Sequence, residues 1–278
     1  MKVIERYPGS VGEIVQGKYN GIDVLLSCPI NLYTEIILSD EKQRDNEEEY
    51  IKSYRFIDNI LDEWGYENKK ISLSINSKIP KGKGFASSTA DLCAIYNGLI
   101  RLTGRKFNEE EFIRHCLKIE PTDSIIFKKA TIFDYKKGLY KEEINNYFRF
   151  YVVCFIGENV VDTIDYNNND KLPNLSNIDD LVNKLKEAFK NKDIRKLANV
   201  STESIIRNQH RLKYDQLEKI LEINELIGGL GIIGAHSGNM LGIIFESIDN
   251  HKIKEIKNIN INGYEKIIVE TLNNINKV

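Results

Sequence analysis

The segment from Ile79 to Asp91, IPKGKGFASSTAD, constrains the fold of this chain more than any other stretch. Over residues 71–76, before it, Ile, Leu and Ile alternate with Ser, Ser and Asn, which is the period-two pattern of a half-buried strand. After it, apolar residues recur at helical spacing over residues 92–100, and Gly104 can end that helix. The sequence therefore predicts a strand, a glycine-rich loop and a helix in direct succession.

This loop combines the residue types that bind a nucleotide triphosphate. Gly82 and Gly84 let the backbone approach an anion closely, and the free N–H groups that begin the next helix can bind that anion. Lys81 and Lys83 add positive charge, although either can instead be a solvated surface lysine. The common phosphate-loop spacing G-x-x-x-x-G-K-[ST] does not occur in the sequence, so a plain glycine- and lysine-rich surface turn is the alternative.

Two further glycine-rich segments accompany this loop. One reads YPGSVGEIVQG at residues 7–17, and the other reads GIIGAHSGNMLG at residues 231–242. Together with the spacing P-x-G-x-G-[apolar]-[small]-S-S at residues 80–88, they resemble, in the same order, the three motifs of the GHMP kinases. That superfamily includes galactokinase, homoserine kinase and mevalonate kinase. We refer to residues 7–17, 80–91 and 231–242 as motifs 1, 2 and 3.

The resemblance implies an α+β fold with two domains. Residues 1–147 would form a domain like domain 2 of ribosomal protein S5, with the ATP loop, and residues 148–278 a ferredoxin-like domain with motif 3. The sequence changes character at the same place, because Phe148 to Ile156 is a continuous apolar run typical of a buried strand. Periodicity alone predicts only an α+β protein.

The pattern of apolar, capping and turn residues predicts the individual elements. Strands are expected at residues 2–7, 22–27, 32–38, 70–79 and 266–272, around a turn within residues 125–144, and on both sides of motif 3. Helices are expected after the charged stretch at 40–49 up to Trp64, from the cap Asn108 to before Pro121, and at 178–190, 193–213 and 215–227. A polar linker is expected at 165–177.

Five segments narrow the resemblance to the L-threonine kinases of cobalamin synthesis. They are PGSVGEIVQG in motif 1, LSCPI at 26–30, SSTAD in motif 2, IEPTDS at 119–124 and AHSG at 235–238. The implied activity is an ATP-dependent, Mg²⁺-assisted phosphorylation of the side-chain hydroxyl of L-threonine to O-phospho-L-threonine. A GHMP kinase for another small alcohol, such as homoserine or a sugar, and an inactive nucleotide-binding relative are the alternatives.

Phosphoryl transfer depends on positioning and charge neutralisation more than on covalent chemistry. Ser88 matches the superfamily serine that ligates Mg²⁺, with a helix N-cap as the alternative. Asp123 matches the catalytic aspartate that orients or deprotonates the acceptor, with a turn aspartate after Pro121 as the alternative. Glu120 is expected to bind Mg²⁺ or the substrate ammonium, because the metal glutamate of better-known relatives lies further upstream. The expected nucleotide-binding residues are Pro80, Lys81, Gly82, Lys83, Gly84, Phe85, Ala86, Ser87, Ser88 and Thr89, where Thr89 replaces a more usual alanine.

Motifs 1 and 3 are expected to bind the amino-acid acceptor. Many relatives carry Lys or Arg where this chain has Ser10, so a basic residue from another segment, or none, must stabilise the phosphate charge. The Glu13 carboxylate can pair with a substrate ammonium, unless it is a plain surface residue. The other residues expected at the acceptor are Ser10, Gly12, Gln16, His236 and Ser237, with Ser10, Gln16 and His236 meeting the substrate carboxylate.

Composition argues against several other classes of protein. The formal net charge of −2 does not indicate the basic surface that nucleic-acid-binding proteins carry. The sequence contains no run of about 18 apolar residues, so no membrane span is predicted. The first residues lack the apolar core of a signal peptide. The four cysteines lie scattered in apolar contexts without a C-x-x-C pair, which indicates buried free thiols. We therefore expect a cytoplasmic enzyme whose partners are ATP and L-threonine; the sequence does not determine an oligomeric state.

Overall fold

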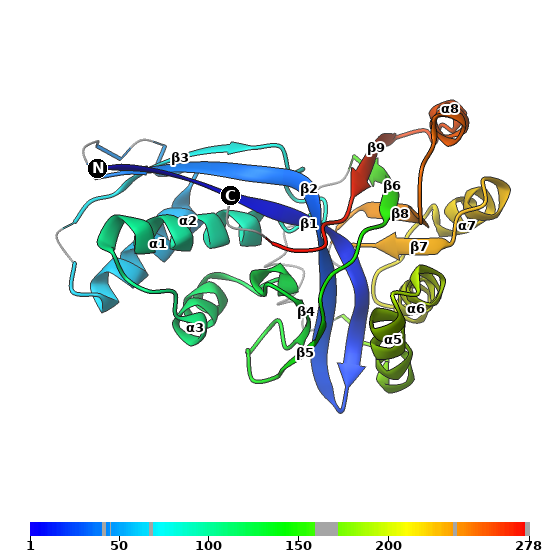
Figure 1. Cartoon of the computed structure of the whole chain (residues 1–278), viewed down its shortest axis with the longest axis horizontal. Helices are drawn as coiled ribbons and strands as arrows, with labels where there is room; N and C mark the ends of the chain where they lie inside the picture. Colours follow the sequence, from blue (N-terminus) through cyan, green and yellow to red (C-terminus); the bar gives the residue numbers. More distant parts are fainter. Residues whose placement is uncertain (41–42, 45, 67–68, 159–171, 236–237, 276–278) are drawn as a thin grey trace.

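The computed structural model describes residues 1–40, 43–44, 46–66, 69–158, 172–235 and 238–275. In these ranges the chain forms one antiparallel sheet of nine strands, which confirms the α+β prediction. The strand order is β5 (Lys141–Asn145), β4 (Ala130–Phe133), β2 (Ile22–Ser39), β1 (Lys2–Tyr19), β7 (Gly231–Gly234), β8 (Met240–Phe245), β6 (Tyr151–Gly157) and β9 (Tyr264–Glu270). Strand β3 (Ser72–Ser77) pairs with β2 off this path. Figure 1 shows helices α1 to α3 beside one end of the sheet and α5 to α8 beside the other.

The chain begins with a long hairpin that runs through the molecule. Its strands are β1 (Lys2–Tyr19) and β2 (Ile22–Ser39), joined by an Asn20-Gly21 turn with both residues at positive φ. The prediction of two separate strands at 22–27 and 32–38 was wrong, because β2 is continuous. Pro29 fits inside it because the β1–β2 register shifts on both sides of the Ser10–Pro29 pair, and such bulges tolerate a proline.

The first half continues with helices packed against this hairpin. Its elements are α1 (Ile51–Glu63), β3 (Ser72–Ser77), α2 (Ser87–Thr103), α3 (Glu109–Ile119), the short 3-10 helix η1 (Ser124–Ile126), β4 (Ala130–Phe133) and β5 (Lys141–Asn145). Gly104 ends α2 in the left-handed conformation, as predicted. The Asn108 side chain accepts a hydrogen bond of 3.2 Å from the Glu111 N–H, which confirms the predicted cap of α3.

The second half contributes four strands and four helices in the described ranges. They are β6 (Tyr151–Gly157), α5 (Asp179–Asn191), α6 (Ile194–Arg207), α7 (Leu217–Leu226), β7 (Gly231–Gly234), β8 (Met240–Phe245), α8 (Asn250–Asn258) and β9 (Tyr264–Glu270). The sequence prediction extended α6 too far, to residue 213, and missed α8. Helix α8 buries only Ile256, so its sequence lacks the repeated apolar positions that would predict a helix.

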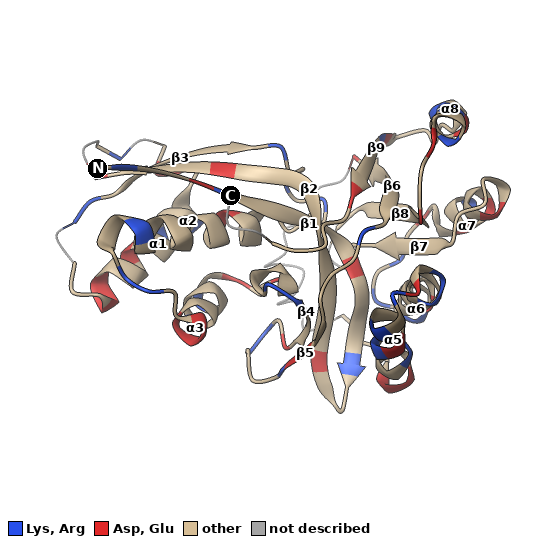
Figure 2. Cartoon of the chain, in the orientation of Figure 1, with Lys and Arg blue, Asp and Glu red and all other residues tan. Residues whose placement is uncertain are grey.

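Apolar side chains from both halves form the larger of two hydrophobic clusters, and a smaller cluster lies among β6 to β9, α7 and α8. All four cysteines are buried and free, as predicted. Figure 2 shows charges of both signs spread over both halves. No helix in the described ranges has the length and apolar character needed to cross a membrane. The predicted boundary at 147/148 stays a prediction, since the sheet continues across both halves.

Candidate active site

Motifs 1 and 2 lie against each other through their backbones. The Ser10 N–H donates to the Phe85 carbonyl at 3.0 Å, and the Gly12 N–H donates to the Gly84 carbonyl at 3.1 Å. A Cβ atom on Gly9 would lie 2.7 Å from the same Phe85 oxygen. Glycine at position 9 therefore lets strand β1 approach the loop of motif 2 closely.

Motif 3 closes against the other two motifs. Glu13 of β1 pairs with Gly234 of β7, at the junction of the two halves. A Cβ on Gly12 would lie 2.5 Å from the Gly234 oxygen, and a Cβ on Gly84 would lie 1.9 Å from the Ala235 Cβ. Both glycines have positive φ, so space and backbone conformation each favour glycine there. Two residues expected at the acceptor, His236 and Ser237, lie outside the described residues.

The start of α2 has the properties of an anion site. The residue that precedes the helix is Ala86, in the left-handed conformation at φ 52°, and it offers no side-chain cap in the described structure. Ser87, Ser88 and Thr89 already belong to the helix, so the N-cap alternative for Ser88 is wrong. A helix start without a capping side chain leaves N–H groups and a positive dipole end for a phosphate.

Asp123 lies between motif 1 and motif 2. Its carboxylate accepts hydrogen bonds from Ser27 Oγ at 3.0 Å, from Ser10 Oγ at 3.4 Å and from the Ile125 N–H at 3.0 Å. Its own N–H donates to Thr89 Oγ1 at 3.3 Å, which ties it to α2. Burial raises the pKa of Asp123 to about 6, against the lowering effect of these donors. The bond from Ile125 makes Asp123 the cap of η1, so the turn role coexists with a position at the site.

A second group of charges lies at the end of α3 and the start of α1. The buried Glu120 carboxylate forms an ion pair of 2.9 Å with Lys52 Nζ. Nearby, Asp91 of α2 accepts a hydrogen bond of 2.6 Å from Thr34 Oγ1. Burial raises the pKa of Asp91 to about 6, while Lys81 lowers it and Glu120 raises it. Two carboxylates and two lysines therefore surround the first turns of α2.

The described residues fit a partial rather than a complete magnesium site. They contain no group of three or more His, Cys, Asp or Glu side chains placed to hold a metal. Mg²⁺ typically binds through one or two carboxylates together with substrate phosphates and water. A serine hydroxyl at Ser88 and a carboxylate at Glu120 match that donor set once a nucleotide contributes its phosphates.

The two lysines of motif 2 differ in their surroundings. The Lys83 ammonium donates to the Gly157 carbonyl at 2.7 Å and to the Glu158 carbonyl at 2.5 Å, at the end of β6. Lys81 is exposed, and its ammonium lies 5.9 Å from the centre of the Tyr50 ring. Lys83 is therefore not a plain surface lysine; it links motif 2 to the second half of the chain.

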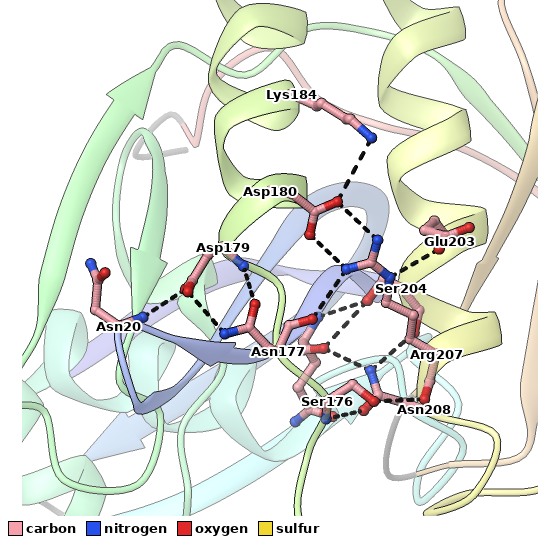
Figure 3. Close-up of polar contacts among 11 residues, drawn as sticks. Asn20, Ser176, Asn177, Asp179, Asp180, Lys184, Glu203, Ser204, Arg207 and Asn208 are labelled. Atoms are coloured by element: carbon pink, nitrogen blue, oxygen red, sulfur yellow. Dashed lines mark hydrogen bonds and ion pairs between the residues drawn. The ribbon is translucent and has the colours of Figure 1, made fainter.

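The far end of motif 1 is held by α6 and the residue after it. The Asn208 side chain donates to the Gln16 carbonyl at 2.9 Å, and the Gln16 N–H donates to Ser204 Oγ at 3.1 Å. Asn208 also accepts from the Ser176 N–H at 3.1 Å, and Figure 3 shows the surrounding network with Arg207. Helix α6 ends at Arg207, with Asn208 as its C-cap, rather than at residue 213.

Comparison with known proteins agrees with the three motifs. Residues 49–128 match the family model for the GHMP kinases N terminal domain. The chain carries a GHMP kinase N-terminal domain. It is 26% identical to the L-threonine kinase of Citrobacter freundii over 264 residues, which cover 91% of this chain and 90% of that relative. It is also 26% identical to the L-threonine kinase of Salmonella typhimurium over 261 residues, which cover 91% and 86%.

Solved structures of GHMP kinases share the fold of this chain. A homoserine kinase from Cytophaga hutchinsonii superposes with a TM-score of 0.73 at 15% identity, covering 98% of this chain and 95% of that one. The mevalonate-3-kinase of Thermoplasma acidophilum gives a TM-score of 0.71 at 12% identity, covering 99% and 97%. These likenesses concern the fold and leave the acceptor open.

Sequence reasoning missed several side chains around the candidate active site. Ser27 lies in the LSCPI segment and Asp91 ends motif 2, so both belonged to recognised segments but received no role. Lys52 and Asn208 had no local signal, because each becomes relevant only through a contact across the fold. Thr89 was expected at the nucleotide, and its hydroxyl accepts a hydrogen bond from the backbone N–H of Asp123, a contact that the sequence did not indicate.

Proposed function

We propose that this protein is a GHMP-type kinase that transfers the γ-phosphoryl group of ATP to the side-chain hydroxyl of L-threonine, giving O-phospho-L-threonine for cobalamin synthesis. The observation that carries the proposal is the meeting of motifs 1, 2 and 3 beside the Asp123 carboxylate. Similarity to two L-threonine kinases over 91% of the chain supports threonine as the acceptor.

In this proposal, the loop from Pro80 to Thr89 holds the triphosphate at the start of α2. Ser88 and Glu120 would hold Mg²⁺, which neutralises charge on the phosphate oxygens when it is bound. The exposed Lys81 and the helix start add positive potential there. Lys52, beside Glu120, is a candidate for the basic residue that motif 1 lacks.

Asp123 is the proposed base. As the bond forms between the threonine hydroxyl oxygen and the γ-phosphorus, the bond from that phosphorus to the β–γ bridging oxygen breaks and ADP leaves. The hydroxyl proton passes to the Asp123 carboxylate, which Ser27 and Ser10 hold in place. A carboxylate with a pKa of about 6 is ionised at neutral pH and still has an appreciable affinity for a proton.

The acceptor site is proposed at the junction of motifs 1 and 3. Glu13 is only 6% exposed and lies where β1 meets β7, which supports a role for its carboxylate in pairing with the substrate ammonium. Gln16 and His236 would meet the substrate carboxylate, with Gly12 and Ser237 lining the same space. Ser10 already donates to Asp123, which supports a role beside the base in addition to the carboxylate contact.

A coupled assay of ADP release tests this proposal. Threonine, serine, homoserine and simple sugars are compared as acceptors, and phosphorus NMR identifies the product. Threonine is expected to be the best acceptor. N-acetyl-threonine, which lacks the ammonium, should be very poor, and Glu13→Gln should raise the KM for threonine far more than the KM for ATP. A preference for homoserine or a sugar would overturn the acceptor, and ATP binding without ADP release for any acceptor would favour the inactive relative.

A further inference from the structure

A second cavity lies apart from the candidate active site. It encloses about 550 Å³ between β1, α2, the start of α3, η1 and the β4–β5 hairpin. Small-molecule sites typically measure roughly 300–1,000 Å³. Among the described residues, no side chain that we assign to ATP, Mg²⁺ or threonine lines it.

One wall of this cavity is apolar. Its apolar and aromatic lining residues are Tyr7, Phe107, Ile126, Phe127 and Ile275. Phe107 is 40% exposed, which is unusual for an aromatic ring that packs against other rings of the core. The Tyr7 hydroxyl is already engaged, since it donates to the Ile125 carbonyl at 2.8 Å. This wall therefore offers apolar surface for the body of a ligand.

The rest of the lining carries an excess of positive charge. Its four cations are Arg6, Lys128, Lys129 and Lys141, against the two acids Glu109 and Glu143. Three of these cations are paired: Lys129 with Glu143 at 2.5 Å, Lys141 with Glu109 at 2.6 Å, and Arg6 with Glu35, outside the lining, at 3.7 Å. The exposed Lys128 forms no ion pair among the described residues. An apolar wall beside such a cation suits a small molecule with an aromatic or aliphatic body and one anionic group.

The cavity also touches the two elements that present the proposed base. Ile126 and Phe127 follow Asp123 through η1, and Tyr7 precedes Ser10 on β1. The Tyr7–Ile125 hydrogen bond joins these elements directly behind the contact between Ser10 and Asp123. A ligand in the cavity would therefore contact both the strand that carries Ser10 and the segment that carries Asp123.

We propose that this cavity is a second ligand site, for a small amphipathic anion, and that its occupant changes the rate of phosphoryl transfer without competing with ATP. The binding part stands independently of the kinase reaction. The effect on rate rests on the proposed function, because it acts through Asp123.

The fluorescent probe 8-anilinonaphthalene-1-sulfonate tests the binding part, since it combines aromatic rings with one sulfonate. Native protein is expected to bind about one equivalent, and saturating Mg-ATP should leave that binding in place. Lys128→Glu should weaken it by about tenfold through charge reversal, and Asn97→Phe should weaken it by filling the cavity from α2. Lys190→Glu, an exposed charge reversal at the end of α5, is the matched control and should bind like the native chain.

Displacement of the probe by ATP, or equal affinity in native, Lys128→Glu and Asn97→Phe proteins, would overturn the second site. In the threonine assay, the probe should change kcat without raising the KM for ATP, and Asn97→Phe should abolish that change. An unchanged kcat with the cavity occupied would refute the effect on rate. Failure to phosphorylate threonine would count against the proposed function, and the probe titration would still decide the binding part.

Discussion

Two carboxylates three residues apart in sequence, Glu120 and Asp123, lie in opposite electrostatic surroundings. Glu120 is buried beside the ammonium of Lys52, so its charge is compensated. In the described structure, Asp123 has only neutral partners: two serine hydroxyls and one backbone N–H. Neutral donors hold a carboxylate in place but offset burial only in part, and the pKa of Asp123 stays raised to about 6.

The difference separates two chemical roles. A carboxylate beside a cation is suited to hold that cation or to bind a metal, because both contacts use its negative charge. A carboxylate held by neutral donors keeps its affinity for a proton and is suited to act as a base. The absence of Lys or Arg at position 10 of motif 1 contributes directly to this state, because Ser10 brings a hydroxyl where many relatives bring a charge.

The largest expected effect comes from removing the base. Asp123→Asn keeps the size of the side chain and should lower kcat by about 10²–10⁴-fold while ATP binding, measured by calorimetry, is retained. Asp62→Asn, which changes an exposed carboxylate of α1, should behave like the native protein. If Asp123→Asn lost ATP binding or failed to fold, Asp123 would have a structural role, and its contrast with Glu120 would not concern catalysis.

The next largest effect concerns the metal side. Ser88→Ala should lower kcat by about 10²-fold and raise the Mg²⁺ concentration needed for half-maximal rate, because phosphate charge is less well neutralised. Thr103→Ala, at the other end of the same helix, is the control for general damage to α2. Native turnover of Ser88→Ala at saturating Mg²⁺ would take Ser88 out of the metal site.

A smaller effect concerns the pH at which the base works. Asp123 accepts a proton only when ionised, so kcat should fall as the pH drops through about 6. Ser27→Ala removes a donor that lowers the pKa of Asp123, and the acid limb should move upward by about one pH unit. Ser201→Ala, at a buried serine in α6, should leave the limb unchanged. An unmoved limb in Ser27→Ala would show that another group controls it.

The smallest effect concerns the free energy of unfolding. Burial raises the pKa of Asp91 in the folded chain, so the folded state binds a proton more readily than the unfolded state, and stability falls as the pH rises from about 4 to about 6. Asp91→Asn keeps an oxygen for Thr34 and removes the buried charge.

This variant should be more stable than the native chain by roughly 1–2 kcal/mol at pH 7.5 and by about half as much at pH 5 in urea unfolding, because pH 5 lies midway through the window. The pH slope should become shallower without vanishing, because Asp123 titrates in the same window. An equal or larger gain at pH 5 would mean that the charge of Asp91 is not what costs stability.

The sequence predicted the elements whose signals are local. Alternation, caps and turn residues indicated β3, α1 to α3 and α5, and the glycines of the three motifs indicated where segments approach closely. The sequence did not predict contacts between residues that are far apart along the chain. Two separate strands were predicted over residues 22–38, yet β2 continues through Pro29 because the β1–β2 register shifts on both sides of the Ser10–Pro29 pair. The partners of Glu120 and Gln16 depend on residues far along the chain.

The anchoring of motif 1 by Asn208 has a consequence for how the chain is made. Gln16 and Asn208 are 192 positions apart, yet a hydrogen bond joins them. At a synthesis rate of roughly 5–20 residues per second, residue 16 is added to the chain about 10–40 s before residue 208. Strand β1 can therefore pair with β2 early in synthesis, but its far end can bind Asn208 only after α6 has been made. A ribosome stalled short of α6 should hold a nascent chain whose hairpin has formed and whose motif 1 remains open to protease.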